Sequence, residues 1–342
     1  MTVPARAFIS DLDGLSPSAD EKAFLRDERP WGLIVFKRNV ASPEQLRDLT
    51  ASFRDLVGRP DAPVLVDQEG GRVQRLGPPV WPDYPPARAF GRLYGERPEE
   101  GLRAARLCAR LIAFDLEACG IDVDCLPVLD VPVAGADEVI GDRAYGTDVG
   151  SVVALARETV EGLMAGGVLP VMKHVPGHGR ADADTHLAQP VTHATLHELD
   201  QTDFAAIRPF VHLPMAMTVH MVLAAVDPHR PATQSPLVIE TIVRERLGFD
   251  GLLMTDDLSM QALGGAVGPR AARCIAAGCD VVLHCNDPLD ARIAVARAVP
   301  ELKGRALHRA ERALAVKRAP EPFDADAARE ELDALLAIPL AA

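Results

Sequence analysis

The feature that most constrains the fold is a regular alternation of short apolar segments with longer amphipathic ones. The apolar segments suit buried strands, and the stretches between them have helical periodicity, most clearly over 43–57 and 99–119. Several helical stretches reach a glycine just before the next strand, as helices commonly do. The expected strands are 7–10, 33–36, 64–67, 121–124, 169–172, 216–219, 252–255 and 281–284, and the expected terminating glycines are Gly120, Gly167, Gly251 and Gly278.

Eight strands alternating with helices predict an α/β fold, a single (β/α)8 TIM-like barrel, and 342 residues suit that fold. An open doubly wound sheet is the structural alternative. No Gly/Ser-rich linker and no internal repeat divides the chain, so residues 1–342 are expected to form one barrel domain. The Ala/Glu/Leu-rich tail, 319–342, is expected to be a peripheral C-terminal helix.

The composition disfavours several classes of partner. A net charge of −13 argues against a nucleic-acid surface and against sustained contact with anionic lipid. Residues 1–13 contain no basic region followed by a long apolar run, so neither a secretory signal nor a transmembrane segment is expected. The six cysteines include no Cys-x-x-Cys pair and are interpreted as buried reduced thiols. These features together predict a cytoplasmic protein.

Polar and charged residues follow nearly every expected strand. In a (β/α)8 barrel the carboxyl ends of the strands meet at one rim, where the functional residues lie. Polar loops alone would not place so many ionisable groups at one rim, so a binding or catalytic site is predicted there. The polar and charged residues at the expected strand ends are Asp11, Asp13, Lys37, Arg38, Asp67, Glu69, Asp130, Lys173, His174, His220, Asp256, Asp257, His284 and Asn286.

The segment 66–75, Val-Asp-Gln-Glu-Gly-Gly-Arg-Val-Gln-Arg, combines a strand end with a glycine pair. Gly70 and Gly71 permit a tight turn close to a ligand. Asp67 could accept hydrogen bonds from sugar hydroxyls, and Arg75 offers a planar fork of donors. A salt bridge at the strand end is the alternative role for Asp67. The glycine pair is not a phosphate loop, because no Gly-Lys-Ser/Thr follows it.

The segment 172–186 contains three histidines, which raises the question of a metal. His174 and His178 are four residues apart, but Pro176 and Gly177 lie between them. That spacing cannot present two imidazoles on one helical face, and the glutamate of the helical zinc motif is missing. No metal is therefore expected.

The same segment instead suggests acid/base chemistry. Lys173 and His174 are expected to leave the strand and point into the pocket. Asp184 and His186 are two residues apart, so in an extended conformation they fall on one side of the chain. A carboxylate beside an imidazole orients the ring and stabilises its protonated form, which a general acid requires.

Two further segments carry charges next to structural signals. An apolar strand runs directly into Asp256 and Asp257, and a helix cap is the alternative role for Asp257. Arg143 lies in a glycine-flanked loop where it could bind an anionic or polyhydroxyl group. A local ion pair between Arg143 and Asp142 is the alternative.

Together these segments resemble glycoside hydrolase family 3, and within it the bacterial β-N-acetylglucosaminidases that recycle cell-wall muropeptides. Two motifs carry the resemblance, which extends to about residue 286. One is Lys-His-x-Pro-Gly-His-Gly followed by Asp-x-His, and the other is Asp-Gln-Glu-Gly-Gly-Arg-Val-Gln-Arg. It implies that Asp256 is the nucleophile, His186 the general acid/base and Asp184 its orienting partner. It also implies a substrate site formed by Asp67, Arg75, Arg143, Lys173 and His174.

The resemblance further implies a retaining β-N-acetylhexosaminidase that removes terminal β-linked N-acetylglucosamine by double displacement, with muropeptides as substrates. No cofactor, nucleic-acid or membrane partner is expected, and the chain is expected to be a monomer. A phosphorylase of the same glycosides is the main alternative, because a neutral histidine base would not repel phosphate. The residues also leave open a sugar-binding barrel without activity and a metal-dependent hydrolase.

Overall fold

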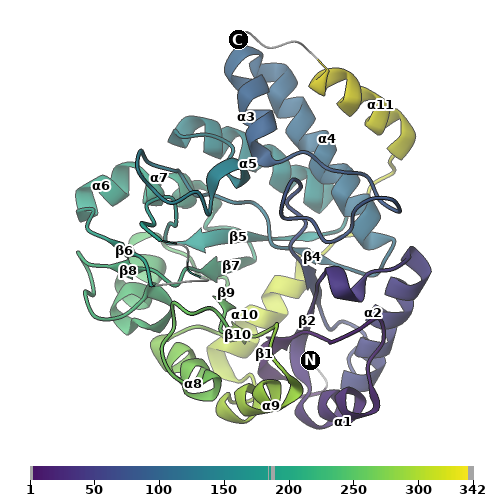
Figure 1. Ribbon diagram of the computed structural model, residues 1–342, viewed down its shortest axis with the longest axis vertical. Helices are drawn as coiled ribbons and strands as arrows, with labels where there is room; N and C mark the ends of the chain where they lie inside the picture. The colour runs from purple at the N-terminus through teal and green to yellow at the C-terminus, as the bar shows by residue number, and fades with distance from the viewer. Residues whose placement is uncertain (1–2, 184, 186–188, 338–342) are drawn as a thin grey trace.

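Eight parallel strands close into a barrel in the computed structural model, which describes residues 3–183, 185 and 189–337 (Figure 1). Neighbouring strands around the ring follow the order β1-β10-β9-β7-β5-β4-β3-β2, and β2 pairs again with β1. The predicted (β/α)8 barrel is therefore confirmed. The strands are β1 Arg6–Ser10, β2 Pro30–Val35, β3 Val64–Val66, β4 Val123–Asp124, β5 Leu169–Val175, β7 Met215–Thr218, β9 Leu252–Asp257 and β10 Val281–Leu283.

Two strands run further than the sequence predicts, and both carry site residues. The ladder between β5 and β7 continues to the pair Val175 and Thr218, and the ladder between β9 and β10 reaches Asp257. Lys173 and His174 therefore lie within β5, and the prediction that they leave the strand is wrong. They still line the cavity, because it opens where the last residues of these strands face the barrel interior.

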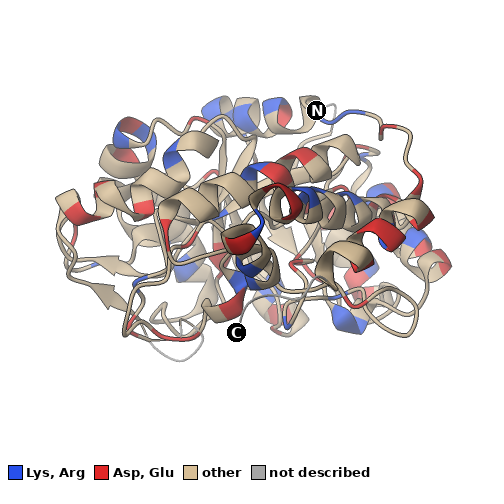
Figure 2. Cartoon of the chain, turned by 90° about the horizontal axis from the view of Figure 1, so that it is seen from above, with Lys and Arg blue, Asp and Glu red and all other residues tan. Residues whose placement is uncertain are grey.

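Helices cover the outside of the barrel, and acidic and basic residues are interspersed along them (Figures 1 and 2). The two clearest predicted helices correspond to α2 and α4. The α-helices are α1 Ala19–Glu28, α2 Pro43–Val57, α3 Ala87–Glu96, α4 Pro98–Glu117, α5 Val149–Ala165, α6 Leu196–Gln201, α7 Asp203–Ile207, α8 Val267–Ala277, α9 Leu289–Ala298, α10 Gly304–Ala315 and α11 Ala325–Leu336. The 3-10 helices are η1 Lys37–Asn39, η2 Gly141–Arg143, η3 Arg208–Phe210 and η4 Ala232–Gln234, and η5 Val238–Arg246 is a π-helix.

Three of the four predicted terminating glycines follow a helix with positive φ, and one does not. The helix before β9 is followed by Gly248, with φ +81°, so the role predicted for Gly251 is wrong. Gly251 is instead required by packing, because a Cβ there would lie 2.6 Å from the ring of Phe249. The three with positive φ are Gly120 (+73°), Gly167 (+77°) and Gly278 (+113°).

A second, two-stranded sheet joins two segments that leave the barrel rim. Strand β6 (Val191–Thr192) pairs in parallel with β8 (Val222–Leu223). The sheet therefore holds the chain after β5 against the chain after β7.

The C-terminal helix α11 lies along the outer side of α4 (Figure 1). Arg103 of α4 forms an ion pair of 2.7 Å with Glu331, and Arg329 contacts Asp115 at 3.3 Å. All six cysteines lie in the described part of the chain, where they are buried and free. No helix among the described residues is both long and apolar enough to cross a membrane.

Candidate active site

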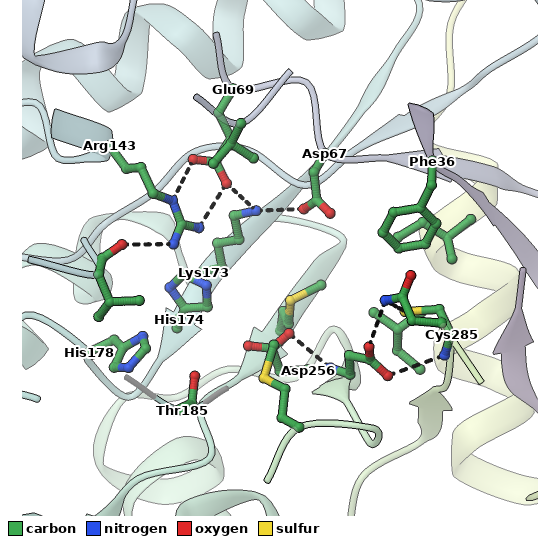
Figure 3. Close-up of a pocket in the computed structure, with 18 of the residues that line it drawn as sticks. Phe36, Asp67, Glu69, Arg143, Lys173, His174, His178, Thr185, Asp256 and Cys285 are labelled. Atoms are coloured by element: carbon green, nitrogen blue, oxygen red, sulfur yellow. Dashed lines mark hydrogen bonds and ion pairs between the residues drawn. The ribbon is translucent and has the colours of Figure 1, made fainter. Parts of the chain in front are cut away.

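A cavity at the carboxyl ends of the strands brings together most of the residues that the sequence singles out (Figure 3). Six of the eight predicted site residues line it, namely Asp67, Arg75, Arg143, Lys173, His174 and Asp256. The remaining two, Asp184 and His186, lie outside the described residues. Thr185, which is between them in sequence, is buried and lines the cavity.

One wall of the cavity is a network of alternating charges. The ammonium group of Lys173 lies 2.8 Å from Asp67 Oδ1 and 2.6 Å from Glu69 Oε1. Arg143 donates two hydrogen bonds of 2.8 Å, one to each oxygen of Glu69, and Arg75 donates to Asp67 Oδ2 at 3.1 Å. Three cations thus surround two carboxylates, and the fork of Arg143 is fixed in one orientation.

The network keeps its members charged although they are buried or half-buried. Burial alone would raise the carboxyl pKa values, but nearby cations outweigh it. Arg143 and Lys173 lower the pKa of Glu69 to about 2, while Lys173 and Arg75 hold the pKa of Asp67 well below its usual range. Burial disfavours the charged form of Lys173, yet the two carboxylates raise its pKa above the ordinary value. The wall therefore presents fixed acceptors and fixed donors, an arrangement suited to a ligand rich in hydroxyl groups.

The predicted glycine turn positions this network. Gly70 and Gly71 both have positive φ, and the turn closes with a hydrogen bond from the Glu69 amide to the carbonyl of Val73 at 2.9 Å. A Cβ on Gly70 would lie 2.3 Å from the carbonyl oxygen of Pro85. The glycine pair is thus required by the chain packed against it, and this packing fixes where Glu69 points.

A second buried pair lies beside the network. Asp130 Oδ2 is 2.6 Å from Nδ1 of His174, and Asp130 Oδ1 accepts a hydrogen bond of 2.8 Å from the main-chain amide of His178. Burial opposes ionisation of Asp130, but His174 lowers the pKa of this carboxyl to about 2. Because Nδ1 is engaged, Nε2 is the nitrogen that His174 can offer to a ligand.

The expected nucleophile, Asp256, is the penultimate residue of β9. One carboxylate oxygen accepts a hydrogen bond of 2.8 Å from the amide of Asp257, and the other has no hydrogen-bond partner in the described part of the chain. Burial would raise the pKa of Asp256, but His174 and His220 outweigh it and lower the pKa. The result is an ionised carboxylate with one oxygen unpaired among the described residues, as attack on an electrophilic carbon requires.

The adjacent Asp257 has a structural role. Its Oδ1 accepts from the amides of Ser259 and Cys285 at 2.9 and 3.2 Å, and its Oδ2 accepts from the hydroxyl of Ser259 and the amide side chain of Asn286 at 2.6 and 3.1 Å. The helix-cap alternative is wrong, because a turn follows Asp257 and the next helix begins at Val267. Asp257 holds the loops after β9 and β10 together.

The contacts of Asp142 and His220 show what each of these two residues does. Asp142 pairs with Arg72 at 3.0 Å, so the ion pair considered between Arg143 and Asp142 is wrong. His220 is fully buried and its Nε2 lies 3.0 Å from the carbonyl oxygen of Asp257, which makes it a core histidine.

One group of side chains could offer ligands to a metal ion. The candidate ligand atoms of Asp130, His174 and His178 all lie within 4.8 Å of one another. Asp130 already forms a short hydrogen bond with His174, so an ion using both would have to replace that bond. The arrangement is better suited to orienting imidazoles than to holding a preformed metal site.

The sequence of the chain matches the family described as glycosyl hydrolase family 3 N terminal domain over residues 6–318. The chain belongs to glycosyl hydrolase family 3. It is therefore a glycoside hydrolase, and it shares its (β/α)8 barrel with solved enzymes of family 3.

Relatives of known name agree with this assignment. A beta-hexosaminidase of Methylococcus capsulatus is 41% identical over 282 residues, which cover 81% of this chain and 82% of the relative. NagZ from Neisseria gonorrhoeae, solved in complex with N-trifluoroacetyl-D-glucosamine, has a TM-score of 0.85 at 31% identity and covers 98% of this chain and 97% of its own. A family 3 β-N-acetylglucosaminidase from Paenibacillus sp. also has a TM-score of 0.85, at 29% identity, covering 96% of this chain and 66% of its own.

Three residues in or beside the cavity have no role that the sequence alone assigns. Glu69 and Asp130 are recognisable in sequence only as polar groups at the rim, and His178 only as a candidate metal ligand. No local signal marks their partners, which lie 74 residues from Glu69 and 44 from Asp130.

Proposed function

We propose that this family 3 enzyme hydrolyses terminal β-linked N-acetylglucosamine with retention of configuration. Asp256 serves as nucleophile, His186 as general acid/base and Asp184 as the partner that orients His186. The main support for the proposal is the ionised carboxylate of Asp256 in the same cavity as the network around Lys173. Such a cavity combines a nucleophile with a fixed set of groups that bind hydroxyls.

The nature of the sugar is supported from two sides. The donors and acceptors of Asp67, Arg75, Arg143 and Lys173 match adjacent hydroxyl groups of a pyranose ring, and the ring of Phe36 adds an apolar surface to the wall. The names of the relatives, beta-hexosaminidase and β-N-acetylglucosaminidase, favour an N-acetylhexosamine over other sugars.

The proposed reaction has two displacements. In the first, Asp256 attacks the anomeric carbon, the bond to the leaving oxygen breaks, and protonated His186 gives its proton to that oxygen. In the second, neutral His186 takes a proton from water, the water oxygen bonds to the anomeric carbon, and the carboxylate of Asp256 departs. Two inversions at one carbon give net retention.

The decisive test uses a chromogenic N-acetyl-β-glucosaminide with the wild type and Asp256→Ala. We expect the variant to lose about a thousandfold or more in kcat, because the covalent route is removed. Asp326→Asn, on the exposed side of α11, is the matched control and should keep wild-type turnover. The first product anomer, followed by NMR, should be β. Undiminished turnover in Asp256→Ala would reject the nucleophile, and an α product would reject retention.

We further propose a monomeric, cytoplasmic enzyme that acts on muropeptide fragments. The six buried free cysteines support a reducing compartment. Product analysis on a disaccharide muropeptide in phosphate buffer tests both substrate and acceptor. Free N-acetylglucosamine is the expected product. Formation of N-acetylglucosamine 1-phosphate would show that the enzyme is a phosphorylase instead of a hydrolase. A muropeptide that stays uncleaved would reject that substrate.

A further inference from the structure

His178 is a buried polar residue of the cavity wall that the mechanism above does not use. It is 2% exposed and lines the cavity, and Figure 3 places it on the side of His174 and Thr185. Neither of its ring nitrogens has a hydrogen-bond partner among the described residues. Buried polar side chains are almost always paired, so an unpaired imidazole in a cavity wall indicates a bond that forms with a ligand.

The main chain around His178 is held in place, so the ring position is determined by the fold. Its amide donates to the buried carboxylate of Asp130 at 2.8 Å. On either side, a Cβ on Gly177 would lie 2.5 Å from Asp203, and a Cβ on Gly179 would lie 2.2 Å from the carbonyl oxygen of Val131. These contacts fix the position of the His178 ring before a ligand binds.

The neighbours of the His178 ring limit its movement and determine its charge. It packs edge-to-face on His174, with ring centroids 5.2 Å apart. Burial, assisted by His174, lowers the pKa of His178 to about 4, so the ring is neutral at physiological pH. A neutral imidazole carries one donor and one acceptor.

This combination differs from that of the charged network. Lys173 and Arg143 can only donate, and the ionised Asp67 and Glu69 can only accept. His178 is therefore matched to a group that itself donates and accepts, such as a sugar hydroxyl or an acetamido group.

We propose that His178 is a substrate-contacting residue whose ring nitrogens hydrogen-bond a hydroxyl or acetamido group of the sugar bound in this cavity. The inference rests on the proposed glycosidase function. It adds a specificity contact beyond the charged network and the expected catalytic residues.

The test compares His178→Phe, which keeps a flat ring but removes both nitrogens, with His178→Asn, which restores a donor and an acceptor. Hydrolysis of the chromogenic N-acetyl-β-glucosaminide gives kcat and KM, and the rise in Tm on adding N-acetylglucosamine reports binding. His308→Phe, on the exposed face of α10, is the matched control.

For His178→Phe we expect kcat/KM to fall about tenfold or more and the ligand-induced rise in Tm to shrink. The Tm of the ligand-free variant should equal or exceed the wild-type Tm, because an unpaired buried polar group has been removed. His178→Asn should recover part of the loss in kcat/KM.

Kinetics of His178→Phe equal to those of the wild type would overturn the proposal. So would a lowered ligand-free Tm together with an unchanged ligand-induced rise, since that pattern marks a purely structural role. An inactive wild type would instead reject the glycosidase function itself, so the two failures are distinguishable.

Discussion

Replacing Glu69 by Gln tests whether the charge network of the cavity stabilises the fold. The carboxylate of Glu69 receives two hydrogen bonds of 2.8 Å from Arg143 and lies 2.6 Å from Lys173. The side chains of Glu69 and Lys173 are only 3% and 2% exposed, so solvent screens the interaction little. Glutamine keeps the shape but removes the charge, and it places an N–H group against donors.

The size of the effect follows from the pKa of the carboxyl. A pKa lowered from 4.5 to about 2 in the folded protein corresponds to about 3 kcal/mol of stability at neutral pH. Removing one partner of a buried ion pair generally costs about 3–5 kcal/mol, which agrees. We therefore expect Glu69→Gln to lower the free energy of unfolding by about 3 kcal/mol at pH 7, measured by urea denaturation.

The dependence on pH gives the prediction a second, sharper part. The folded pKa of Glu69 lies below the unfolded value, so its stabilisation is complete above about pH 5 and is lost as the pH falls from about 4.5 toward 2. The difference in the free energy of unfolding between wild type and Glu69→Gln should therefore decrease by about 1 kcal/mol when the pH is lowered from about 7 to about 4.

A matched control separates this effect from any loss of a surface ion pair. Asp142→Asn removes the exposed pair with Arg72 and should change stability by about 0–1 kcal/mol. The reasoning would be refuted if Glu69→Gln lowered the free energy of unfolding by less than about 1 kcal/mol at pH 7. It would also be refuted if the difference in unfolding free energy between wild type and variant stayed constant down to about pH 4.

Two further substitutions test two more buried carboxylates of the site. Asp130→Asn should lower kcat/KM on the chromogenic substrate about 10- to 100-fold, because the charge-assisted hydrogen bond to His174 is lost. An unchanged kcat/KM would show that Asp130 does not position the ring of His174. Asp257→Ala should lower the free energy of unfolding by about 3 kcal/mol, since it leaves the buried amide of Cys285 and its other donors unpaired. Equal urea midpoints for wild type and Asp257→Ala would contradict the structural role.

Much of the fold is predictable from local patterns. Each expected strand corresponds to a barrel strand, and the predicted helix over 43–57 has the bounds of α2. Apolar runs and helical periodicity depend on near neighbours in the sequence, so they can be recognised without knowing the fold. The bounds of β5 and β9 are not predictable in this way, because they depend on which residues of β7 and β10 are available for pairing.

The polar rim of the barrel is likewise predictable from the sequence, whereas the crowding around it is not. Glycine is an instructive case. Gly251 and Gly248 look alike in sequence, yet they are required for different reasons. A Cβ on Gly251 would lie 2.7 Å from the carbonyl oxygen of Pro214, whereas Gly248 has a left-handed backbone. Crowding between distant segments is a property of packing, and no local pattern reports it.

The barrel and the set of polar residues at the ends of its strands follow from the order of the amino acids alone. Which of these residues act on one another depends on the tertiary structure. Lys173 meets Asp67 across 106 residues of chain, and Arg143 meets Glu69 across 74. Closure of the barrel creates these pairs, and the charges and pKa values of the site follow from them, because electrostatic interactions depend on distance in space and on burial.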